Sequence, residues 1–406
     1  MIGNIQLPKD SLRTFLEAYF SVILPMPKAG IYIHIPFCQA KCPYCAFYSV
    51  AGQAALLPTF VTALVQEIRS CPVDTSSWNF ETLFLGGGTP SLLAASQLET
   101  ILQALYNQFP MNQVKEITLE VNPGTTTTQA LADYHTLGIN RLSIGIQSWE
   151  PTHLLWLSRL HTVQESYQTY HAARKVGFDN INCDLLFGLP GQSLTFWEGG
   201  LNRLLELKPD HISAYSLTVE TGTPLHHQVA EQTVHMPDEG KTAAMFKHTH
   251  KWLQSAGYEH YEIANYALPG KSCLHNLHYW EIRPYLGFGP SAHSFDEVSR
   301  WWNVSSLETY LKRLSQGQSP IARQERLNKT QLTNEIIGFG LRTSQGVNLH
   351  RLPGPFRRRL LQRAFRDGSS IKPFLRLRNH HLAPTLEGML YADTLAVELT
   401  FTTENQ

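Results

Sequence analysis

The chain has 406 residues, of which 43% are hydrophobic and 16% charged, and its 33 basic and 33 acidic side chains give a formal net charge of zero. This length can bury a sizeable core and predicts one large domain with a smaller one. A neutral chain is a poor candidate for wrapping nucleic acid over its whole surface, so we expect no nucleic-acid partner. No apolar run reaches transmembrane length.

The first 30 residues form an extension ahead of the predicted fold. Asp10 and Glu17 interrupt its apolar residues, which argues against a secretory signal, and the scarcity of arginine argues against an organellar transit peptide. Residues 11–23 have the spacing of an amphipathic helix. We expect this helix to cover an open edge of the fold, or to be a non-native extension if translation starts at Met26.

Three cysteines stand close together after this extension, Cys38, Cys42 and Cys45, in the spacing CxxxCxxC. The apolar run at residues 31–35 predicts a buried parallel strand, so the cysteines fall in the loop that leaves its carboxyl end. Ligands of α/β proteins gather at such loops. Three thiolates can hold three irons of a [4Fe-4S] cluster, and because no fourth cysteine lies nearby, one iron stays open for a substrate or cofactor.

A zinc site and a disulfide framework are the alternatives for these thiols. Structural zinc takes four closed ligands, usually from two CxxC-type pairs, and the chain has no second pair. Disulfides need an oxidising compartment and an even pairing, which three clustered thiols do not give. The other cysteines, Cys71, Cys183 and Cys273, are scattered, as is typical of a reducing interior. We therefore expect a cytoplasmic protein.

Strand and helix patterns alternate after the cysteine loop with a period of roughly 30 residues. We expect strands at residues 31–35, 82–85, 116–121, 141–146, 181–187 and 211–217. We expect helices between them at residues 59–69, 97–107, 129–137, 163–176 and 196–207. Six such units predict an α/β fold built on an incomplete (β/α)6 parallel barrel.

Glycine and polar residues gather where these strands end. The strand at 82–85 runs into Gly86-Gly-Gly-Thr-Pro-Ser91, whose missing Cβ atoms let a ligand approach the backbone, although such turns also serve as packing corners. Glu120, Gln147 and Asp184 stand at the ends of other strands. Each alone is an ordinary cap or loop residue, but together at one barrel mouth they favour a bound polar cofactor.

These motifs resemble those of a known superfamily. The CxxxCxxC loop followed by the glycine-rich segment resembles the radical S-adenosylmethionine superfamily. The stretches Tyr32-Ile-His-Ile-Pro-Phe-Cys38, Leu142-Ser-Ile-Gly-Ile-Gln147 and Asp184-Leu-Leu-Phe-Gly-Leu-Pro190 are similar to the oxygen-independent coproporphyrinogen III oxidase (dehydrogenase) family within it. The resemblance implies a [4Fe-4S] cluster, S-adenosylmethionine and a reductant for the cluster.

The resemblance also implies which residues line the S-adenosylmethionine pocket. Arg159 would pair with the methionine carboxylate, which its forked guanidinium suits, whereas the alternative for this arginine is a surface ion pair. The full set of implied pocket residues is Tyr32, Tyr44, Gly87, Gly88, Thr89, Glu120, Gln147, Arg159, Asp184, Thr218 and His293.

Two subgroups share this pattern and differ in function. The dehydrogenases usually carry a further cysteine two residues after the third one, where this chain has Phe47. The chain resembles instead the HemW-type heme chaperones, which have an aromatic residue there and a later His-Asn-x-x-Tyr-Trp element. This implies a protein that binds heme and passes it to an acceptor, such as a respiratory heme protein. The alternative is radical oxidative decarboxylation of coproporphyrinogen III in porphyrin biosynthesis.

The later element supplies the residues that the resemblance implies for heme contact: His275, Asn276, Tyr279 and Trp280. If this segment is helical, His275, His278 and Tyr279 share one face, so that a neutral imidazole can reach heme iron beside aromatic side chains. Cys273 and His293 are alternative iron ligands. Without the resemblance, a packed and hydrogen-bonded His and Trp pair is the ordinary interpretation.

The chain changes character after about residue 305. Helical patterns at 307–314 and 332–341 precede a segment at 386–393 that resembles the winged-helix-like, mostly helical end of HemW-type proteins. A basic run here predicts a solvated face, or a surface for acidic groups such as porphyrin propionates or a membrane. Its members are Arg357, Arg358, Arg359, Arg363, Arg366 and Arg376.

We expect four parts along the chain. They are an extension at 1–30, a radical S-adenosylmethionine barrel at 31–265, a heme-contact segment at 266–304 and a C-terminal helical domain at 305–406.

Overall fold

The computed structural model describes residues 26–402, so the helix predicted at residues 11–23 lies outside the described part. All six predicted strands are present and lie side by side, in sequence order and parallel, in one sheet. They are β1 (Lys28–Ile35), β4 (Asn79–Gly87), β5 (Glu116–Val121), β6 (Arg141–Gln147), β7 (Ile181–Phe187) and β8 (His211–Ser216).

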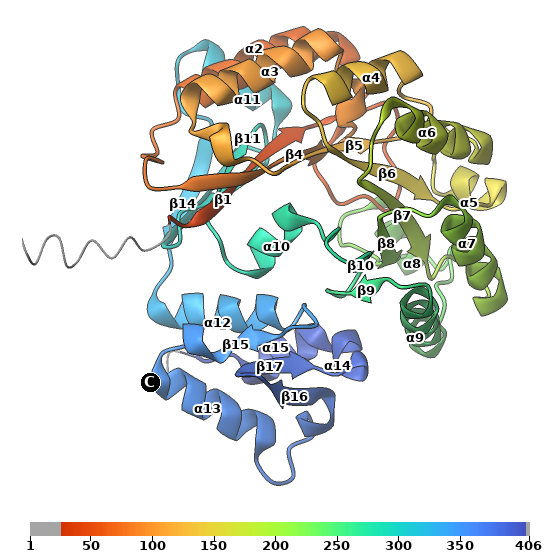
Figure 1. Ribbon diagram of the computed structural model, residues 1–406, viewed down its shortest axis with the longest axis vertical. Helices are drawn as coiled ribbons and strands as arrows, with labels where there is room; N and C mark the ends of the chain where they lie inside the picture. The colour runs from red at the N-terminus through yellow and green to blue at the C-terminus, as the bar shows by residue number, and fades with distance from the viewer. Residues whose placement is uncertain (1–25, 403–406) are drawn as a thin grey trace, which may run out of the picture.

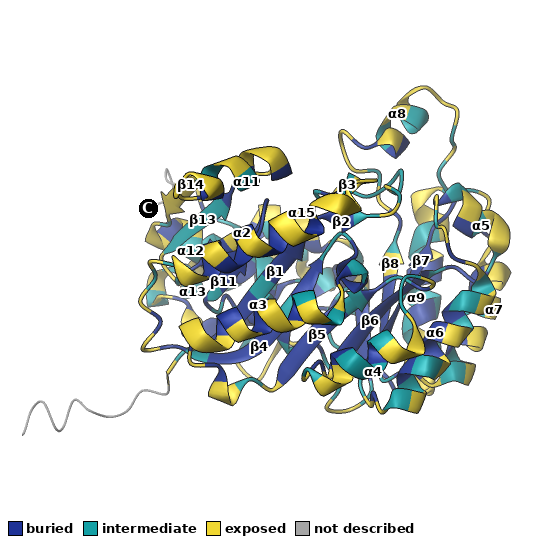
Figure 2. Ribbon diagram, turned by 90° about the horizontal axis from the view of Figure 1, so that it is seen from above, coloured by how far each residue is buried: buried dark blue, intermediate teal, exposed yellow. Residues whose placement is uncertain are grey.

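The predicted helices return the chain along the outside of this sheet, where Figure 2 shows their exposed faces turned away from the buried strands. They are α2 (Leu57–Arg69), α3 (Ala95–Gln108), α4 (Thr128–Thr136), α6 (Val163–Val176) and α7 (Leu194–Leu207). Several begin with a side-chain cap, for example at Thr162, whose hydroxyl accepts a hydrogen bond from the backbone N–H of Glu165. The expected (β/α) architecture is confirmed.

The two faces of the strands differ in chemistry. In β1, Ile31, Ile33 and Ile35 are fully buried in the core between sheet and helices. Tyr32 and His34 alternate with them and so point into the barrel. Because the same alternation recurs in β5, β6 and β7, polar side chains line the interior and apolar side chains hold the helices. The barrel is therefore built around a polar cavity.

The sheet extends beyond the predicted strands at both edges. β11 (Tyr285–Phe288) pairs in parallel with the free side of β1, and the antiparallel strands β12 (His293–Phe295), β13 (Ser299–Asn303) and β14 (Ile321–Arg326) follow it. At the opposite edge, β10 (Asn265–Ala267) and β9 (Glu259–His260) continue antiparallel from β8. The barrel stays open between these edges, and α10 (Leu274–Trp280) lies in the opening in Figure 1.

Shorter elements complete this part of the fold. The strands β2 (Phe37–Cys38) and β3 (Val50–Ala51) form a separate parallel pair. The remaining helices are α5 (Pro151–Trp156), α8 (Pro224–Ala230), α9 (Glu239–Ser255) and α11 (Leu307–Ser315), and the 3₁₀ turns η1 (Ala54–Leu56), η2 (Pro90–Leu92) and η3 (Met111–Gln113).

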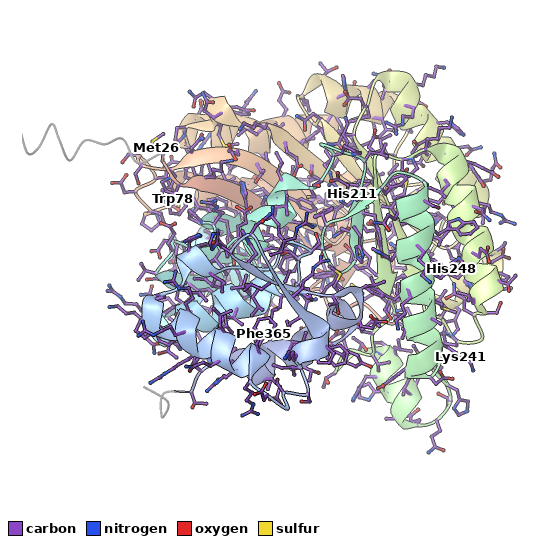
Figure 3. All side chains as sticks on the ribbon, turned by 60° about the horizontal axis from the view of Figure 1, so that its bottom comes forward. Met26, Trp78, His211, Lys241, His248 and Phe365 are labelled. Carbon is purple, nitrogen blue, oxygen red and sulfur yellow. The ribbon has the colours of Figure 1, made fainter. Side chains whose placement is uncertain are left out.

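The C-terminal unit has its own hydrophobic core, which includes Ile337, Leu360 and Leu382. It lies below the barrel in Figure 1, and Figure 3 shows Phe365 in it. Its elements are α12 (Lys329–Gly340), β15 (Val347–Asn348), η4 (Leu349–Arg351), α13 (Gly354–Phe365), η5 (Lys372–Phe374), β16 (Leu375–Arg378), β17 (His381–Pro384), α14 (Leu386–Leu390) and α15 (Ala392–Leu399).

A hairpin gives this unit its winged-helix character. β16 and β17 pair so that Arg378 faces His381, and the turn residues Asn379 and His380 both have positive φ, 48° and 61°. Two left-handed turn residues are the geometry of a tight two-residue hairpin. The small sheet runs in the order β15-β17-β16. None of the helices within residues 26–402 combines the length and the hydropathy of a membrane-spanning segment.

Candidate functional site

The cysteine loop leaves the carboxyl end of β1 and is fixed by backbone hydrogen bonds on two sides. The N–H of Val50 donates to the carbonyl of Pro36 at 2.7 Å, and the N–H of Thr89 donates to the carbonyl of Phe37 at 2.7 Å. From the outside, the N–H of Leu225 in α8 donates to the carbonyl of Pro43 at 2.9 Å. The loop that carries Cys38, Cys42 and Cys45 is therefore held by β3, the glycine-rich turn and α8.

A cavity of about 950 Å³ opens at this loop and extends into the barrel. All three thiols of the loop line it, each half-buried and free of disulfide bonds. Every residue of the implied S-adenosylmethionine pocket also lines this cavity: Tyr32, Tyr44, Gly87, Gly88, Thr89, Glu120, Gln147, Arg159, Asp184, Thr218 and His293. Its size is at the upper end of ordinary ligand pockets.

Arg159 is the cation closest to the cysteine loop in this cavity. Its Nη1 lies 4.0 Å from Sγ of Cys42, and its Nη2 donates to Oδ1 of Asn122 at 2.6 Å and to the carbonyl of Gly145 at 2.7 Å. Its Nε is buried and has no hydrogen-bond partner. Among the described residues no carboxylate forms an ion pair with it, so the surface ion pair considered from the sequence is absent there. The guanidinium is positioned and still has a donor to offer.

A chain of polar side chains connects the cysteine loop to Arg159. The hydroxyl of Thr89 lies 3.5 Å from Sγ of Cys38 and accepts a hydrogen bond from Nδ2 of Asn122 at 2.9 Å. Asn122 in turn accepts from Arg159 through its Oδ1. Sequence reasoning missed Asn122, although it follows directly after the strand that carries Glu120.

Packing of the glycine-rich turn against β1 requires glycine at two positions. A Cβ on Gly88 would lie 2.7 Å from the carbonyl oxygen of Phe37 and 2.8 Å from that of Ile35, and one on Gly87 would lie 2.5 Å from the imidazole of His34. The N–H of Gly88 also donates to Ile35 at 2.8 Å. The glycines thus let the turn lie directly against β1, and Gly87 and Gly88 line the cavity at the same time.

Two acidic side chains face the cavity from β5 and β7, the strands on either side of β6. Glu120 accepts a hydrogen bond from the N–H of Gly87 at 3.0 Å, and Asp184 accepts from Asn182 at 2.7 Å and from Ser143 at 3.2 Å. Burial, followed by the charge of Asp184, raises the pKa of Glu120 to about 8, and burial raises the pKa of Asp184 as well. Both therefore gain stabilisation from a ligand that offers hydrogen-bond donors.

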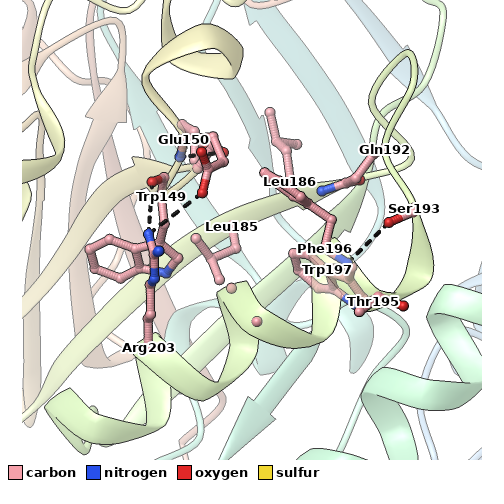
Figure 4. A pocket seen from close by; sticks show the side chains of 14 residues that line it. Trp149, Glu150, Leu185, Leu186, Gln192, Ser193, Thr195, Phe196, Trp197 and Arg203 are labelled. Atoms are coloured by element: carbon pink, nitrogen blue, oxygen red, sulfur yellow. Dashed lines mark hydrogen bonds and ion pairs between the residues drawn. The ribbon is translucent and has the colours of Figure 1, made fainter.

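Gln147 sits where β6 ends and adopts a left-handed backbone conformation with a φ of 66°, which is rare for a residue other than glycine. It lines the central cavity and also a second, outer cavity of about 290 Å³ between β7 and α7. Figure 4 shows this outer cavity, in which Arg203 reaches the carboxylate of Glu150 and the carbonyl of Trp149. Gln147 thus belongs to the wall between the two cavities.

The rim of the cavity carries the other residues named from the sequence. Phe47 is 68% exposed and lines the mouth beside the thiols. His293 stacks on Trp302 with ring centroids 5.6 Å apart, and its imidazole makes no hydrogen bond within residues 26–402. Thr218 is exposed and donates to Glu220 at 3.2 Å.

The His-Asn-x-x-Tyr-Trp element is helical and forms α10, and its side chains divide between two environments. His275 is only 1% exposed, and its Nδ1 and Nε2 form hydrogen bonds of 2.8 Å with Thr82 and Tyr279. His275, Asn276 and Tyr279 line the inner end of the cavity. Trp280 points elsewhere: its ring packs against Phe339 of the C-terminal unit, 6.0 Å between centroids.

Burial lowers the pKa of His275 well below its ordinary value and so favours the neutral imidazole. Both ring nitrogens are already engaged, however, so this histidine can bind a metal only after it gives up one of those hydrogen bonds. Cys273 is fully buried and lies 3.5 Å from Oε1 of Glu116, outside the cavity lining.

The basic run near the C-terminus does not form one solvent-exposed face. Arg358, Arg359, Arg366 and Arg376 are exposed, but Arg363 lies over the ring of Phe401 at 4.8 Å and donates to the carbonyl of Thr400. That arginine packs against the C-terminal core.

The donor set suits a [4Fe-4S] cluster better than a single ion. Among residues 26–402 no three His, Cys, Asp or Glu side chains lie close enough together to hold one metal ion. A [4Fe-4S] cluster takes each thiolate on a different iron, so its cysteines stand around the cluster. Three free thiols on one loop, beside a positioned guanidinium with an unpartnered Nε, fit such a cluster with a carboxylate-bearing ligand next to it.

Comparison with known proteins agrees with this site. Residues 32–198 match the family model described as the Radical SAM superfamily. The crystallised coproporphyrinogen III oxidase HemN of Escherichia coli, a radical SAM enzyme, superposes with a TM-score of 0.77 over 96% of this chain and 93% of HemN; at 21% identity this likeness shows the fold alone. The family match identifies a radical S-adenosylmethionine domain at residues 32–198, and such a domain implies a [4Fe-4S] cluster and S-adenosylmethionine.

Sequence relatives define the family of this chain. The heme chaperone HemW of Mycobacterium tuberculosis is 33% identical over 378 residues, 92% of this chain and 95% of the relative, and HemW of Escherichia coli is 38% identical over 272 residues, 67% and 71%. The mitochondrial radical S-adenosyl methionine domain-containing protein 1 of Danio rerio is 32% identical over 381 residues, 91% and 86%. This chain belongs to the HemW family.

Proposed function

We propose that the chain is a heme chaperone, which binds heme and passes it to an acceptor protein with the help of a [4Fe-4S] cluster and S-adenosylmethionine. The observation that carries this proposal is that one cavity joins the two motifs. The three thiols stand at its mouth, and His275, Asn276 and Tyr279 of α10 line its inner end. Two of the relatives described above, from Mycobacterium tuberculosis and Escherichia coli, are named heme chaperones.

Cys38, Cys42 and Cys45 would hold the cluster, and Arg159 would bind the carboxylate of S-adenosylmethionine. Together, cluster and cofactor supply one-electron chemistry at a sulfonium when both are bound. The chain's own contribution is to orient the ligand: Arg159 holds its guanidinium next to Cys42 with Nε unpartnered, and Glu120 and Asp184 offer acceptors deeper in the barrel. In a chaperone this pair regulates heme binding or release, and a reductant for the cluster is then a partner.

Two histidines of the cavity are candidates for binding heme iron. His293 lies at the mouth with no hydrogen bond from its ring within the described chain. His275 lies at the inner end and must release Thr82 or Tyr279 before it can coordinate. The Soret spectra of His293→Ala and His275→Gln separate the two, because glutamine at 275 keeps hydrogen-bonding groups but offers no imidazole to iron.

The remaining parts of the proposal concern where the protein works and with what. The sequence divides the chain into a barrel at residues 31–265, a heme-contact segment at 266–304 and a C-terminal unit at 305–406. We move the start of the C-terminal unit to α12, because α11 packs in the barrel core and β14 belongs to the barrel sheet. Six free cysteines suit a reducing compartment such as the cytoplasm. The exposed arginines of α13 offer a surface for an acidic acceptor or an anionic membrane, and nucleic acid is not a partner.

The test is to reconstitute the cluster anaerobically and run two assays in parallel. Heme is titrated by absorbance, and coproporphyrinogen III is incubated with the protein, S-adenosylmethionine and a reductant. We expect stoichiometric heme binding and no porphyrinogen turnover, because Phe47 stands where the dehydrogenases have a further cysteine. Formation of protoporphyrinogen would contradict the proposal and assign the chain to the enzyme subgroup.

A further inference from the structure

Arg141 is a buried cation at the inner end of the cavity that neither the cluster nor S-adenosylmethionine uses. It is the first residue of β6, and with Ser143, Gly145 and Gln147 it forms the face of this strand that lines the cavity. Its side chain is only 2% exposed, which makes it one of the largest fully buried side chains of the described fold. A buried arginine normally has a partner for its charge.

The hydrogen bonds of Arg141 leave most of its donors free. Its one hydrogen bond within residues 26–402 runs from Nη1 to the hydroxyl of Thr118, at a long 3.5 Å. Its Nε is buried without a partner. No carboxylate of the described chain lies within 4.0 Å of the guanidinium. This group carries five N–H donors and stays charged at any physiological pH. Leaving such a group unpaired in a protein interior is costly.

The nearest acidic side chains already accept hydrogen bonds from other groups. Glu116 accepts hydrogen bonds from the N–H groups of Leu274 and His275, at 2.9 and 3.0 Å, and so caps the start of α10. Asp184 accepts from Asn182 and Ser143. These carboxylates stabilise the cation from a distance without pairing with its guanidinium, and Arg141 lines the cavity.

The two cavity arginines stand too far apart to share one anionic group. Nη2 of Arg159 binds the carbonyl of Gly145, four residues further along the strand that begins with Arg141. Four residues of strand span about 13 Å. S-adenosylmethionine carries a single carboxylate, which belongs next to the cysteine loop with Arg159. An anion at Arg141 must therefore come from a second ligand.

The walls beside this site suit a flat, largely apolar ligand. Tyr32 and Phe84 stack with centroids 6.2 Å apart, and Tyr279 meets Tyr285 edge to face at 4.7 Å. All four line the same cavity. Aromatic walls with one forked cation at the end are complementary to a planar ring that bears a carboxylate arm.

We propose that Arg141 binds a carboxylate of the tetrapyrrole that enters the barrel. Its guanidinium pairs with one propionate of heme, while the ring lies against the aromatic side chains of the cavity wall. This inference rests on the proposed heme-binding function and assigns an orientation to it: the propionate edge points inward, away from the cysteine loop. The carboxylate completes the hydrogen bonds that Arg141 lacks.

The test compares heme with heme dimethyl ester, in which both propionates are neutral, on the cluster-loaded full-length protein. Dissociation constants are measured by absorbance titration for the wild type, Arg141→Gln and Arg141→Lys. We expect Arg141→Gln to weaken heme binding about 10- to 100-fold, as for a lost charge-assisted hydrogen bond, and to leave the affinity for the ester unchanged. Arg141→Lys keeps the charge but lacks the forked guanidinium, so its affinity for heme should lie between those of the wild type and Arg141→Gln.

The matched control is Arg69→Gln, which removes an exposed arginine in the last turn of α2 and should leave the preference for heme over its ester intact. Binding of S-adenosylmethionine, at the other end of the cavity, reports that Arg141→Gln is folded. The inference is overturned if Arg141→Gln binds heme like the wild type, if it loses affinity for heme and for the ester equally, or if Arg69→Gln alone removes the preference. Failure of the wild type to bind either tetrapyrrole would overturn the proposed function together with it.

Discussion

Nη1 of Arg159 lies 4.0 Å from Sγ of Cys42, although the two residues are 117 positions apart in the chain. The barrel brings the two residues together. The cysteine loop follows β1, and Arg159 lies in the turn after α5. Nη2 of Arg159 donates a hydrogen bond of 2.6 Å to Oδ1 of Asn122, which follows β5. A thiolate loop and a cation that lacks a carboxylate partner in the described chain thus share one edge of the cavity. This pairing is the physical basis for placing a cluster and a carboxylate ligand side by side.

The first prediction concerns this arginine. Arg159→Gln should weaken S-adenosylmethionine binding about 10- to 100-fold, because a charge-assisted hydrogen bond to the carboxylate is lost, and should leave the iron content unchanged. Equilibrium binding to the reconstituted protein measures this. Arg203→Gln, at the outer cavity, is the matched control and should bind as the wild type does. Loss of iron from Arg159→Gln would show that the arginine supports the loop instead of the ligand.

The second prediction concerns the cluster thiols. Cys42→Ala should abolish the iron-sulfur absorption of anaerobically reconstituted protein, whereas Cys71→Ala should keep about four irons per chain, because Cys71 lies after α2 and away from the cavity. Iron and sulfide analysis with the visible spectrum measures both. A full cluster in Cys42→Ala would refute the assignment of the loop.

The third prediction tests whether the glycine-rich turn is fixed by packing. Gly88→Ala should destabilise the protein by about 1–3 kcal/mol, since the added Cβ meets the backbone of residues 35–37, which cannot rotate away. Gly199→Ala, on the exposed side of α7 with no atom within 4 Å of the added Cβ, should be neutral or gain about 0.5–1 kcal/mol of helix stability. Urea unfolding compares them, and equal stabilities would contradict the packing argument.

The fourth prediction is a pH dependence that arises at Glu262, where the barrel meets the C-terminal unit. Glu262 is buried, its Oε1 has no hydrogen-bond partner, and burial raises its pKa from 4.5 to about 7. Between those two values the folded state holds a proton that the unfolded state has released, so stability falls as the pH rises through this window.

Glu262→Gln removes this titration and keeps the shape of the side chain. Relative to the variant, the wild type should lose about 1 kcal/mol between pH 6 and pH 8. Unfolding midpoints at the two pH values measure the difference. A wild type and a variant that change in parallel would show that Glu262 does not titrate in this range.

Local patterns predicted the barrel well. Apolar residues such as Ile31, Ile33 and Ile35 must bury against helices, and this requirement places each strand within three residues of its true limits. The strands β11 to β14 were not predicted, because their pairing depends on the chain crossing the barrel opening and adding to the free side of β1. Pairing over such sequence distances leaves no local signal.

The site was predicted in part for the same reason. Motif residues such as Thr89 and Arg159 do line one cavity, but Asn122 and Arg141 were missed. The alternation along β6, which puts Arg141 on the face of Ser143 and Gly145, was a usable signal for the latter. The burial of His275 could not be predicted from the sequence, because only the fold brings its partners Thr82 and Tyr279 together.

The most direct test of the central claim is heme transfer. The cluster-loaded protein carrying one heme is mixed with an apo-form of a heme protein, and the Soret bands of donor and acceptor are followed over time. We predict that heme moves to the acceptor and that Cys42→Ala, which lacks the cluster, transfers it at a different rate. Heme that stays bound, or that the wild type and the variant release at the rate of free dissociation, would contradict the account.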